Sequence, residues 1–185
     1  MDYLKETPSQ TAGPYVHIGL APAAAGFDIY DRELGFDPVP EDVPGARITV
    51  TGRVIDGMGA PVKDVLIEVW QADASGRYAD SAEGFRGWFR VVPDFETGVF
   101  TLNTIRPGAV GGQAPHLSLW LVARGINVGL QTRMYFPDAD NAADPVLNLI
   151  EQPHRRASLI AGGADGAYTF DIHLQGENET VFLDV

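Results

Sequence analysis

Apolar and polar residues alternate along most of the chain after residue 47, and this pattern predicts β-strands. In segment 48–54 the apolar residues Ile48, Val50 and Val54 are separated by polar or small residues, as expected for a strand buried on one face. Comparable runs occur at 65–70, 98–104, 116–122, 129–136 and 168–174, with a last short run at 180–183. Gly and Pro residues separate the runs. We therefore predict an all-β fold, built as a two-sheet β-sandwich.

Turn and capping residues add detail to this sandwich. The cluster Asp56-Gly57-Met58-Gly59 is typical of a tight turn and predicts a hairpin that joins strand 48–54 to strand 65–70. Helices are expected to be few and short. The candidates are 146–150, opened by Asp144 as the N-cap and Pro145 at the first helical position, and 154–161, opened by Pro153 and closed by Gly162-Gly163.

The first 45 residues differ in character and are expected to form an extended N-terminal arm. They show no clear strand alternation, and they hold almost half of the 13 prolines: Pro8, Pro14, Pro22, Pro38, Pro40 and Pro44. Such an arm packs on its own domain or on a partner, so we divide the chain into an arm, 1–45, and a sandwich domain, 46–185. Within the arm, Gly13 allows close backbone approach, Pro14 stiffens the turn, and Tyr15 offers a ring and a hydroxyl. An ordinary Gly-Pro turn and a surface that meets another molecule both fit these residues.

Composition and charge narrow the class of protein. A length of 185 residues and an apolar content of 45% fit one globular domain with a sizeable core. No run approaches the roughly 20 apolar residues of a bilayer span, and the start MDYLKETPSQ lacks the features of a signal peptide, so a cytoplasmic protein is expected. The absence of cysteine excludes disulfides and thiolate metal ligands. A net charge of −12 disfavours nucleic acid and anionic membranes as partners, so an anionic substrate would need a locally placed cation.

Two residues near strand ends are the main candidates for chemistry. His116 begins a predicted strand directly after a Gly-rich loop, where an imidazole can reach a metal ion or a substrate. The side chain two residues on would share its face and is Ser118, so a hydrogen-bonded structural histidine is the alternative. Arg124 ends a predicted strand before Gly125, which places its guanidinium at a loop tip suited to a carboxylate, although most surface arginines are merely solvated. Arg133 could be buried against an acidic partner or exposed.

Other autonomous sites find little support in the residues. No Gly-x-Ser-x-Gly elbow is present, and the Gly-rich loop 108–112 leads into a strand instead of the helix that a phosphate site needs. Glu68 and Asp73 could form an acid/base pair, but single acidic side chains on strands are usually solvated. The remaining histidines, His17, His154 and His173, lie at no metal-ligand spacing, and only the fold could bring them together.

The stretch 104–118 resembles part of the intradiol ring-cleaving dioxygenases. In that family a Pro-Gly-Pro-Tyr turn and a later His-x-His pair supply a tyrosinate and two imidazoles to a non-haem Fe(III), and a Gly-Arg-Tyr segment supplies another tyrosinate. The same frame here keeps Tyr78 and His116 and has Val110 and Ser118 at the other two ligand positions. Further motifs extend the resemblance over 7–185: TPSQTAGPY from Thr7, EVWQAD from Glu68, ARGIN from Ala123, TRMYF from Thr132, VLNLIEQP from Val146 and QGENETVFLDV from Gln175.

The resemblance implies an iron-free alpha-type subunit, with no metal and no catalytic residue of its own. The family's hetero-oligomers are large assemblies of alpha–beta pairs in which the beta chain holds the Fe(III). There the alpha-chain arm lines the entrance of the partner's active site, which implies that Gly13, Pro14 and Tyr15 face the substrate and that Arg124 reaches the same pocket. The implied reaction is intradiol cleavage of 3,4-dihydroxybenzoate by dioxygen to 3-carboxy-cis,cis-muconate.

Two other classes of function stay open from the sequence. One is a non-catalytic β-sandwich that serves as a binding or structural module, stable as a monomer or homodimer. The other is an enzyme active by itself, with an iron site built from Tyr78, His116 and other tyrosines such as Tyr135. Because a tyrosinate bound to Fe(III) absorbs visible light, colour in the isolated chain would distinguish the second class.

Overall fold

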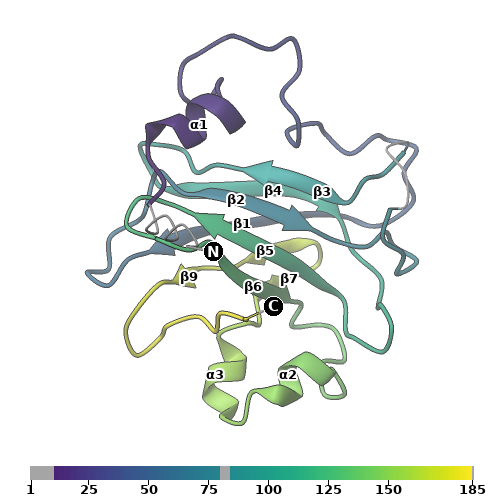
Figure 1. Cartoon of the computed structure of the whole chain (residues 1–185). Coiled ribbons are helices and arrows are strands. Elements are labelled where there is room, and N and C mark those ends of the chain that lie inside the picture. The colour runs from purple at the N-terminus through teal and green to yellow at the C-terminus, as the bar shows by residue number, and fades with distance from the viewer. Residues whose placement is uncertain (1–10, 80–83, 185) are drawn as a thin grey trace, which may run out of the picture.

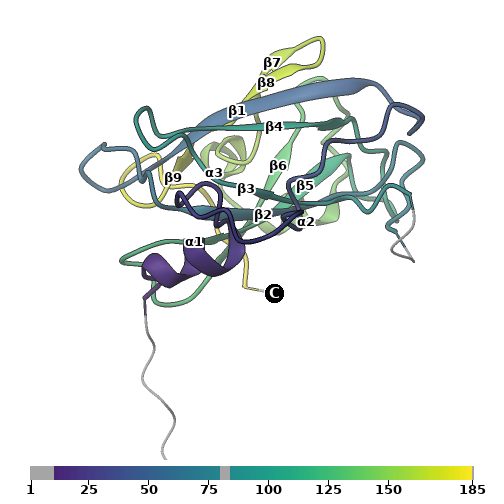
Figure 2. The same ribbon diagram turned by 90° about the horizontal axis from the view of Figure 1, so that it is seen from above.

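Two β-sheets pack face to face in the computed structural model, which describes residues 11–79 and 84–184 (Figure 1). The five-stranded sheet has the order β4 (Val99–Ile105), β1 (Arg47–Ile55), β8 (Ala167–Thr169), β7 (Gly162–Ala164), and β9 (Ile172–His173) also pairs with β1. The four-stranded sheet has the order β3 (Trp88–Val91), β2 (Leu66–Trp70), β5 (His116–Val122), β6 (Leu130–Tyr135). Figure 2 shows the two sheets as separate layers. The predicted two-sheet sandwich is therefore confirmed.

The alternation in the sequence fixes which side chains fill the space between the sheets. In β1 the buried residues include Ile48, Val50 and Val54, and the residues between them are mostly less buried. In β5, Leu117, Leu119 and Leu121 point into the same core. Because each fully buried side chain of this kind contributes roughly 1.5–3 kcal/mol, one face of each sheet supplies most of the stabilisation. The other face of the four-stranded sheet carries polar and aromatic side chains.

Three short helices lie outside the core. They are α1 (Pro14–Leu20), α2 (Pro145–Leu149) and α3 (Pro153–Ala157), and each has proline in its first turn, where the missing N–H costs nothing. Figure 2 shows α1 on the outer side of the four-stranded sheet, and α2 and α3 lie together at the opposite end of Figure 1. Asp144 caps α2 as predicted, since its side chain accepts from the N–H groups of Val146 and Leu147. No helix in the described part of the chain is long and apolar enough to cross a membrane.

The predicted hairpin between the first two strands is wrong. The turn itself forms, because Asp56 Oδ1 accepts hydrogen bonds from the N–H groups of Met58 and Ala60, each 2.9 Å long. The chain then returns only as far as Val62, whose N–H donates to Val54 O at 2.7 Å. Beyond it the chain crosses over, since β1 pairs with β4 and β2 pairs with β3 and β5. Alternation of apolar and polar residues indicates that a strand is buried on one face. It does not indicate which of the two sheets of a sandwich the strand joins.

The arm also departs from the prediction, because it is not extended throughout. Residues 14–20 form α1, and Pro14 starts this helix instead of stiffening an isolated turn. Seven residues are too few for a clear helical period to show in the sequence. Residues 1–10, including Thr7 to Gln10 of the TPSQTAGPY motif, lie outside the described residues, as does Val185.

The remaining differences concern the extent of single elements and one short strand that was not predicted. The expected strand 168–174 is split into β8 and β9, because Asp171 Oδ1 accepts from the N–H of Arg53 at 2.9 Å and interrupts the ladder. The expected strand 180–183 is irregular, although Thr180 N–H donates to His173 O at 2.9 Å. The helix expected over 154–161 ends at Ala157, and strand β3 was not predicted.

Candidate functional site

Two loops meet on the outer face of the four-stranded sheet and bring Tyr78 next to His116. Gly76 has a φ of +79°, and a Cβ there would lie 2.0 Å from Ala109 O, so only glycine permits this approach. Gly108 N–H donates to Asp73 O at 2.9 Å and fixes the second contact between the loops. As a result the Tyr78 hydroxyl lies 3.5 Å from His116 Nε2. The structure thus brings together the two residues that the family resemblance places at ligand positions.

The His116 imidazole is buried and its orientation is fixed. Its side chain is only 3% exposed, and Nδ1 lies 2.8 Å from Ala114 O. Nδ1 must therefore carry the proton and donate to this carbonyl, which leaves the lone pair on Nε2 facing Tyr78. Burial lowers the pKa of His116, and the nearby charge of Arg133 acts in the same direction, while the Ala114 hydrogen bond and Asp144 oppose them. The ring is therefore held neutral, as a metal-binding histidine would be.

The other two positions of the ligand set hold residues that do not fit a metal ion. Val110 pairs with Gln113 through two backbone hydrogen bonds of 3.1 and 2.8 Å in the loop before β5. Ser118 lies on the same face of β5 as His116 and offers only a neutral hydroxyl. Within residues 11–79 and 84–184, no group of three His, Cys, Asp or Glu side chains could hold a metal ion. The residues present therefore do not fit the Fe(III) that the family resemblance implies, because half of the ligand set is missing.

Arg133 occupies the neighbourhood of these lost ligands. Its Nη1 donates to Gln113 Oε1 at 2.6 Å and to the Tyr135 hydroxyl at 3.3 Å. The Tyr135 hydroxyl in turn donates to Asp144 Oδ1 at 3.1 Å, and burial raises the pKa of Tyr135 to about 12. The sequence left the place of Arg133 open. The structure puts it, half-buried, at the head of a hydrogen-bond chain that ends on the cap of α2.

A second candidate site lies between the arm and the sandwich domain. Gly13, Pro14 and Arg124 line one cavity of about 310 Å³, together with apolar side chains that include Phe27 and Phe95. The arm is held there because Gly125 N–H donates to Thr11 Oγ1 at 2.6 Å. Three of the four residues expected to face substrate are thus brought together. The fourth, Tyr15, is 84% exposed and does not line this cavity.

The charge of Arg124 is partly compensated within the chain. Its Nη2 and Nε lie 2.8 and 3.1 Å from Asp64 Oδ2, and the guanidinium is largely exposed at the loop tip, as the sequence suggested. One edge of the guanidinium is engaged by this carboxylate and the rest faces solvent. A second carboxylate could therefore bind on the free edge, or displace Asp64.

His17 was not singled out from the sequence, yet it lines the same cavity. It is 8% exposed, its ring lies 5.8 Å from the Phe95 ring, and its Nε2 has no hydrogen-bond partner among residues 11–79 and 84–184. Burial lowers the pKa of His17, although the Asp64 charge and a hydrogen bond with Val65 oppose this. The sequence could have indicated His17 only if helix α1 had been predicted, because its position on that helix turns the side chain toward the sandwich domain.

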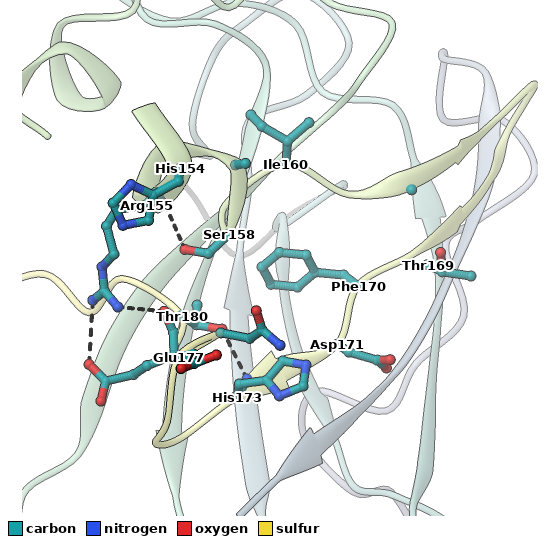
Figure 3. Close-up of a pocket in the computed structure, with 14 residues that line it drawn as sticks. His154, Arg155, Ser158, Ile160, Thr169, Phe170, Asp171, His173, Glu177 and Thr180 are labelled. Atoms are coloured by element: carbon teal, nitrogen blue, oxygen red, sulfur yellow. Dashed lines mark hydrogen bonds and ion pairs between the residues drawn. The ribbon is translucent and has the colours of Figure 1, made fainter. Parts of the chain in front are cut away.

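The other candidates form structural contacts. Glu68 Oε1 accepts from Arg90 Nε at 3.0 Å, and Asp73 Oδ1 closes its own loop by accepting from the N–H groups of Ser75 and Arg77, so they form no acid/base pair. His154 and His173, unrelated by spacing, line one cavity of about 410 Å³ (Figure 3). Two of its charged residues pair with each other, because Arg155 Nη1 donates to the backbone carbonyl of Glu179 at 2.9 Å and Nη2 lies 3.4 Å from Glu179 Oε1.

Comparison with known proteins identifies the family. Residues 29–115 match the family described as Dioxygenase. The chain is 50% identical to the protocatechuate 3,4-dioxygenase alpha chain of Pseudomonas putida, over 100% of this chain and 98% of that one. It is 37% identical to the protocatechuate 3,4-dioxygenase beta chain of Burkholderia cepacia, over 81% of this chain and 74% of that one. Among solved structures, the dioxygenase domain of a carbohydrate-binding fusion protein from Streptomyces sp. SirexAA-E matches with a TM-score of 0.57 and 26% identity, over 83% of this chain and 97% of that one. The chain belongs to the intradiol ring-cleaving dioxygenase family, whose members use non-haem iron.

Proposed function

We propose that this chain is the iron-free alpha subunit of a protocatechuate 3,4-dioxygenase and completes the active site of an iron-bearing beta partner. The observation that carries the proposal is the state of its own ligand set. Tyr78 and His116 are retained in contact, while Val110 and Ser118 replace the other two ligands. A chain that keeps the family's frame over its full length and lacks half of the ligands is suited to assist a partner's metal site. The reaction is intradiol cleavage of 3,4-dihydroxybenzoate by dioxygen to 3-carboxy-cis,cis-muconate.

The cavity between the arm and the domain supplies this chain's contribution to the shared site. An Fe(III) held by the partner would supply Lewis-acid chemistry for the dihydroxy ring of the substrate. Gly13 and Pro14 form a close backbone wall, and Tyr15 extends from it into the space that the partner would fill. Arg124 provides the local cation that a substrate carboxylate needs near a chain of net charge −12. These residues bind and orient the substrate without bonding to the metal.

The surface of the arm supports association with a partner chain. Five large apolar side chains within ten residues of the arm are each at least 36% exposed: Phe27, Ile29, Tyr30, Leu34 and Phe36. Isolated exposed apolar residues are common, but such a concentration is typical of a surface that another protein covers. The likeness of the chain to a beta chain as well as to an alpha chain is consistent with a pair of related subunits. We assign the arm, 1–45, as the segment that packs on the partner.

Iron content and visible absorption test the proposal. The chain should be purified alone and after co-expression with a beta-type chain, and assayed for cleavage of 3,4-dihydroxybenzoate. We expect a colourless, inactive chain alone and a coloured, active complex with the partner. Stoichiometric iron and activity in the isolated chain would refute the proposal, because Tyr78 and His116 would then belong to a complete site. An inactive, colourless co-purified complex would refute it as well.

A further inference from the structure

The rung of the sheet beside the lost ligand carries a cation. Ser118 and Arg133 are direct partners across the β5–β6 ladder, so their side chains project from the same face of the sheet. The next rung pairs His116 with Tyr135, on that same face. The side chain of Arg133 therefore starts next to the position where the family has its second histidine.

The hydrogen bonds of Arg133 hold its charge in this place. Nη1 is shared between Gln113 Oε1 and the Tyr135 hydroxyl, at 2.6 and 3.3 Å. Gln113 belongs to the short bridge that also contains Val110, the other altered ligand position. Asp144 is 1% exposed and balances the charge through the Tyr135 hydroxyl. The guanidinium is thus hydrogen-bonded to the loop that contains Val110, while the backbone of Arg133 lies directly across the ladder from Ser118.

The two retained residues still have the arrangement of metal ligands. Two ligands at about 2 Å from one metal ion lie about 3 Å apart, and Tyr78 Oη and His116 Nε2 are separated by 3.5 Å. The Ala114 carbonyl fixes the imidazole from behind, as the outer partners of a metal-bound histidine do. The two residues therefore still form half of a metal site, with the lone pair of His116 Nε2 directed toward the place where a metal ion would lie. The two missing ligands are one obstacle to a metal ion at this place, and a nearby positive charge would be a second.

We infer that the guanidinium of Arg133 takes over the charge of the metal in this residual site, so that the site is closed by a built-in cation as well as by the loss of two ligands. The inference rests on the proposed function only in that it takes the iron-free state of the wild-type chain as its baseline. A fixed cation repels a second cation in a partly buried setting and uses the hydrogen-bond acceptors around it. We therefore expect that iron can bind only after the positive charge of Arg133 has been removed.

The test restores the two ligands with and without the cation. The chain carrying Val110→Tyr and Ser118→His should be co-expressed with the beta-type partner, and the iron content per alpha–beta pair compared with that of the wild-type complex. We expect no increase for this double variant and none when Arg133→Lys is added, since the charge is kept. Addition of Arg133→Met, which removes the charge and keeps much of the volume, should double the iron content and add a second tyrosinate absorption in the visible. Arg53→Met, at an exposed arginine of β1, is the matched control and should not admit iron.

Three results would overturn the inference. They are a second iron in the double variant with Arg133 intact, a second iron in the Arg133→Lys variant, and an assembled Arg133→Met variant that binds no more iron than the double variant. If Arg133→Met prevents assembly, Arg133→Gln repeats the comparison with a neutral side chain that can still donate to Gln113. A failure of the proposed function would look different, because the wild-type chain would then bind iron or the wild-type complex would lack activity.

Discussion

Arg124, which we propose to bind the substrate carboxylate, forms an ion pair with Asp64. Because the ion pair engages part of the guanidinium, the two substitutions Arg124→Ala and Asp64→Asn should act in opposite directions. Arg124→Ala should raise KM for 3,4-dihydroxybenzoate about two- to fivefold, since an exposed ion pair is worth about 0.5–1 kcal/mol after screening. Asp64→Asn should lower KM by a smaller factor. Steady-state kinetics of the co-purified complex measure both.

Catechol provides the control for this prediction, because it lacks the carboxylate. KM for catechol should change little in either variant, and Arg53→Ala should change KM for neither substrate. Equal losses for both substrates in Arg124→Ala would mean that the residue supports the loop structure and does not recognise the carboxylate.

His17 predicts a dependence of stability on pH. Burial lowers the pKa of this imidazole in the folded chain below its ordinary value of 6.5, so the unfolded chain binds more protons as the pH falls through that value. The free energy of unfolding therefore rises with pH in this window, and the contribution of His17 is present in full above about pH 6.5 and lost below it. His17→Gln should flatten the fall in urea midpoint between about pH 6.5 and 5. A slope that His17→Gln leaves unchanged would contradict the prediction.

At the scale of elements, Asp144 ties α2 to the four-stranded sheet. Its carboxylate caps α2 through Val146 and Leu147 and also accepts from Ala114 N–H at 2.8 Å and from the Tyr135 hydroxyl at 3.1 Å. Asp144→Ala would leave buried donors without a partner, so we expect a loss of about 2–4 kcal/mol in the free energy of unfolding. Asp140→Ala removes one exposed turn contact of 3.2 Å and should cost less than about 0.5 kcal/mol. Urea unfolding followed by tryptophan fluorescence measures the difference, and equal losses would show that the buried network adds nothing.

An element could be predicted from the sequence when the pattern that specifies it lies in consecutive residues. The period of β1 and β5 and the Asp144-Pro145 cap of α2 are written in consecutive residues, and these predictions were confirmed. The pairing of β1 with β4 was not predictable, because alternation does not say which sheet a strand joins. The four residues of β3 and the seven of α1 are too short for a period to show. The contact of Tyr78 with His116 was suggested only by family resemblance, since it depends on how two glycines let distant loops meet.

At the scale of the whole molecule, the arm segment that follows α1 runs over the end opposite to α2 (Figure 1), and it carries exposed apolar side chains. Ile29 and Leu34 are each 55% exposed, while Leu149 on α2 is 79% exposed and serves as a matched apolar position. If the arm packs on the beta-type partner, Ile29→Asp or Leu34→Asp would bury an unpaired charge in the complex and should weaken association at least tenfold. The isolated chain should unfold at an unchanged urea concentration, because both side chains are already exposed in it.

The comparison with Leu149→Asp decides whether the arm is the contact surface. Co-purification with a tagged partner and size-exclusion chromatography with light scattering measure the association of all three variants. Loss of association in the arm variants alone would support the arm as the interface. Loss only in Leu149→Asp would move the interface to the α2 end, and the residues at the arm cavity could not then reach the partner's metal site. The proposed binding of the substrate carboxylate by Arg124 depends on that placement, so a kinetic effect of Arg124→Ala and an association defect of the arm variants should be observed together.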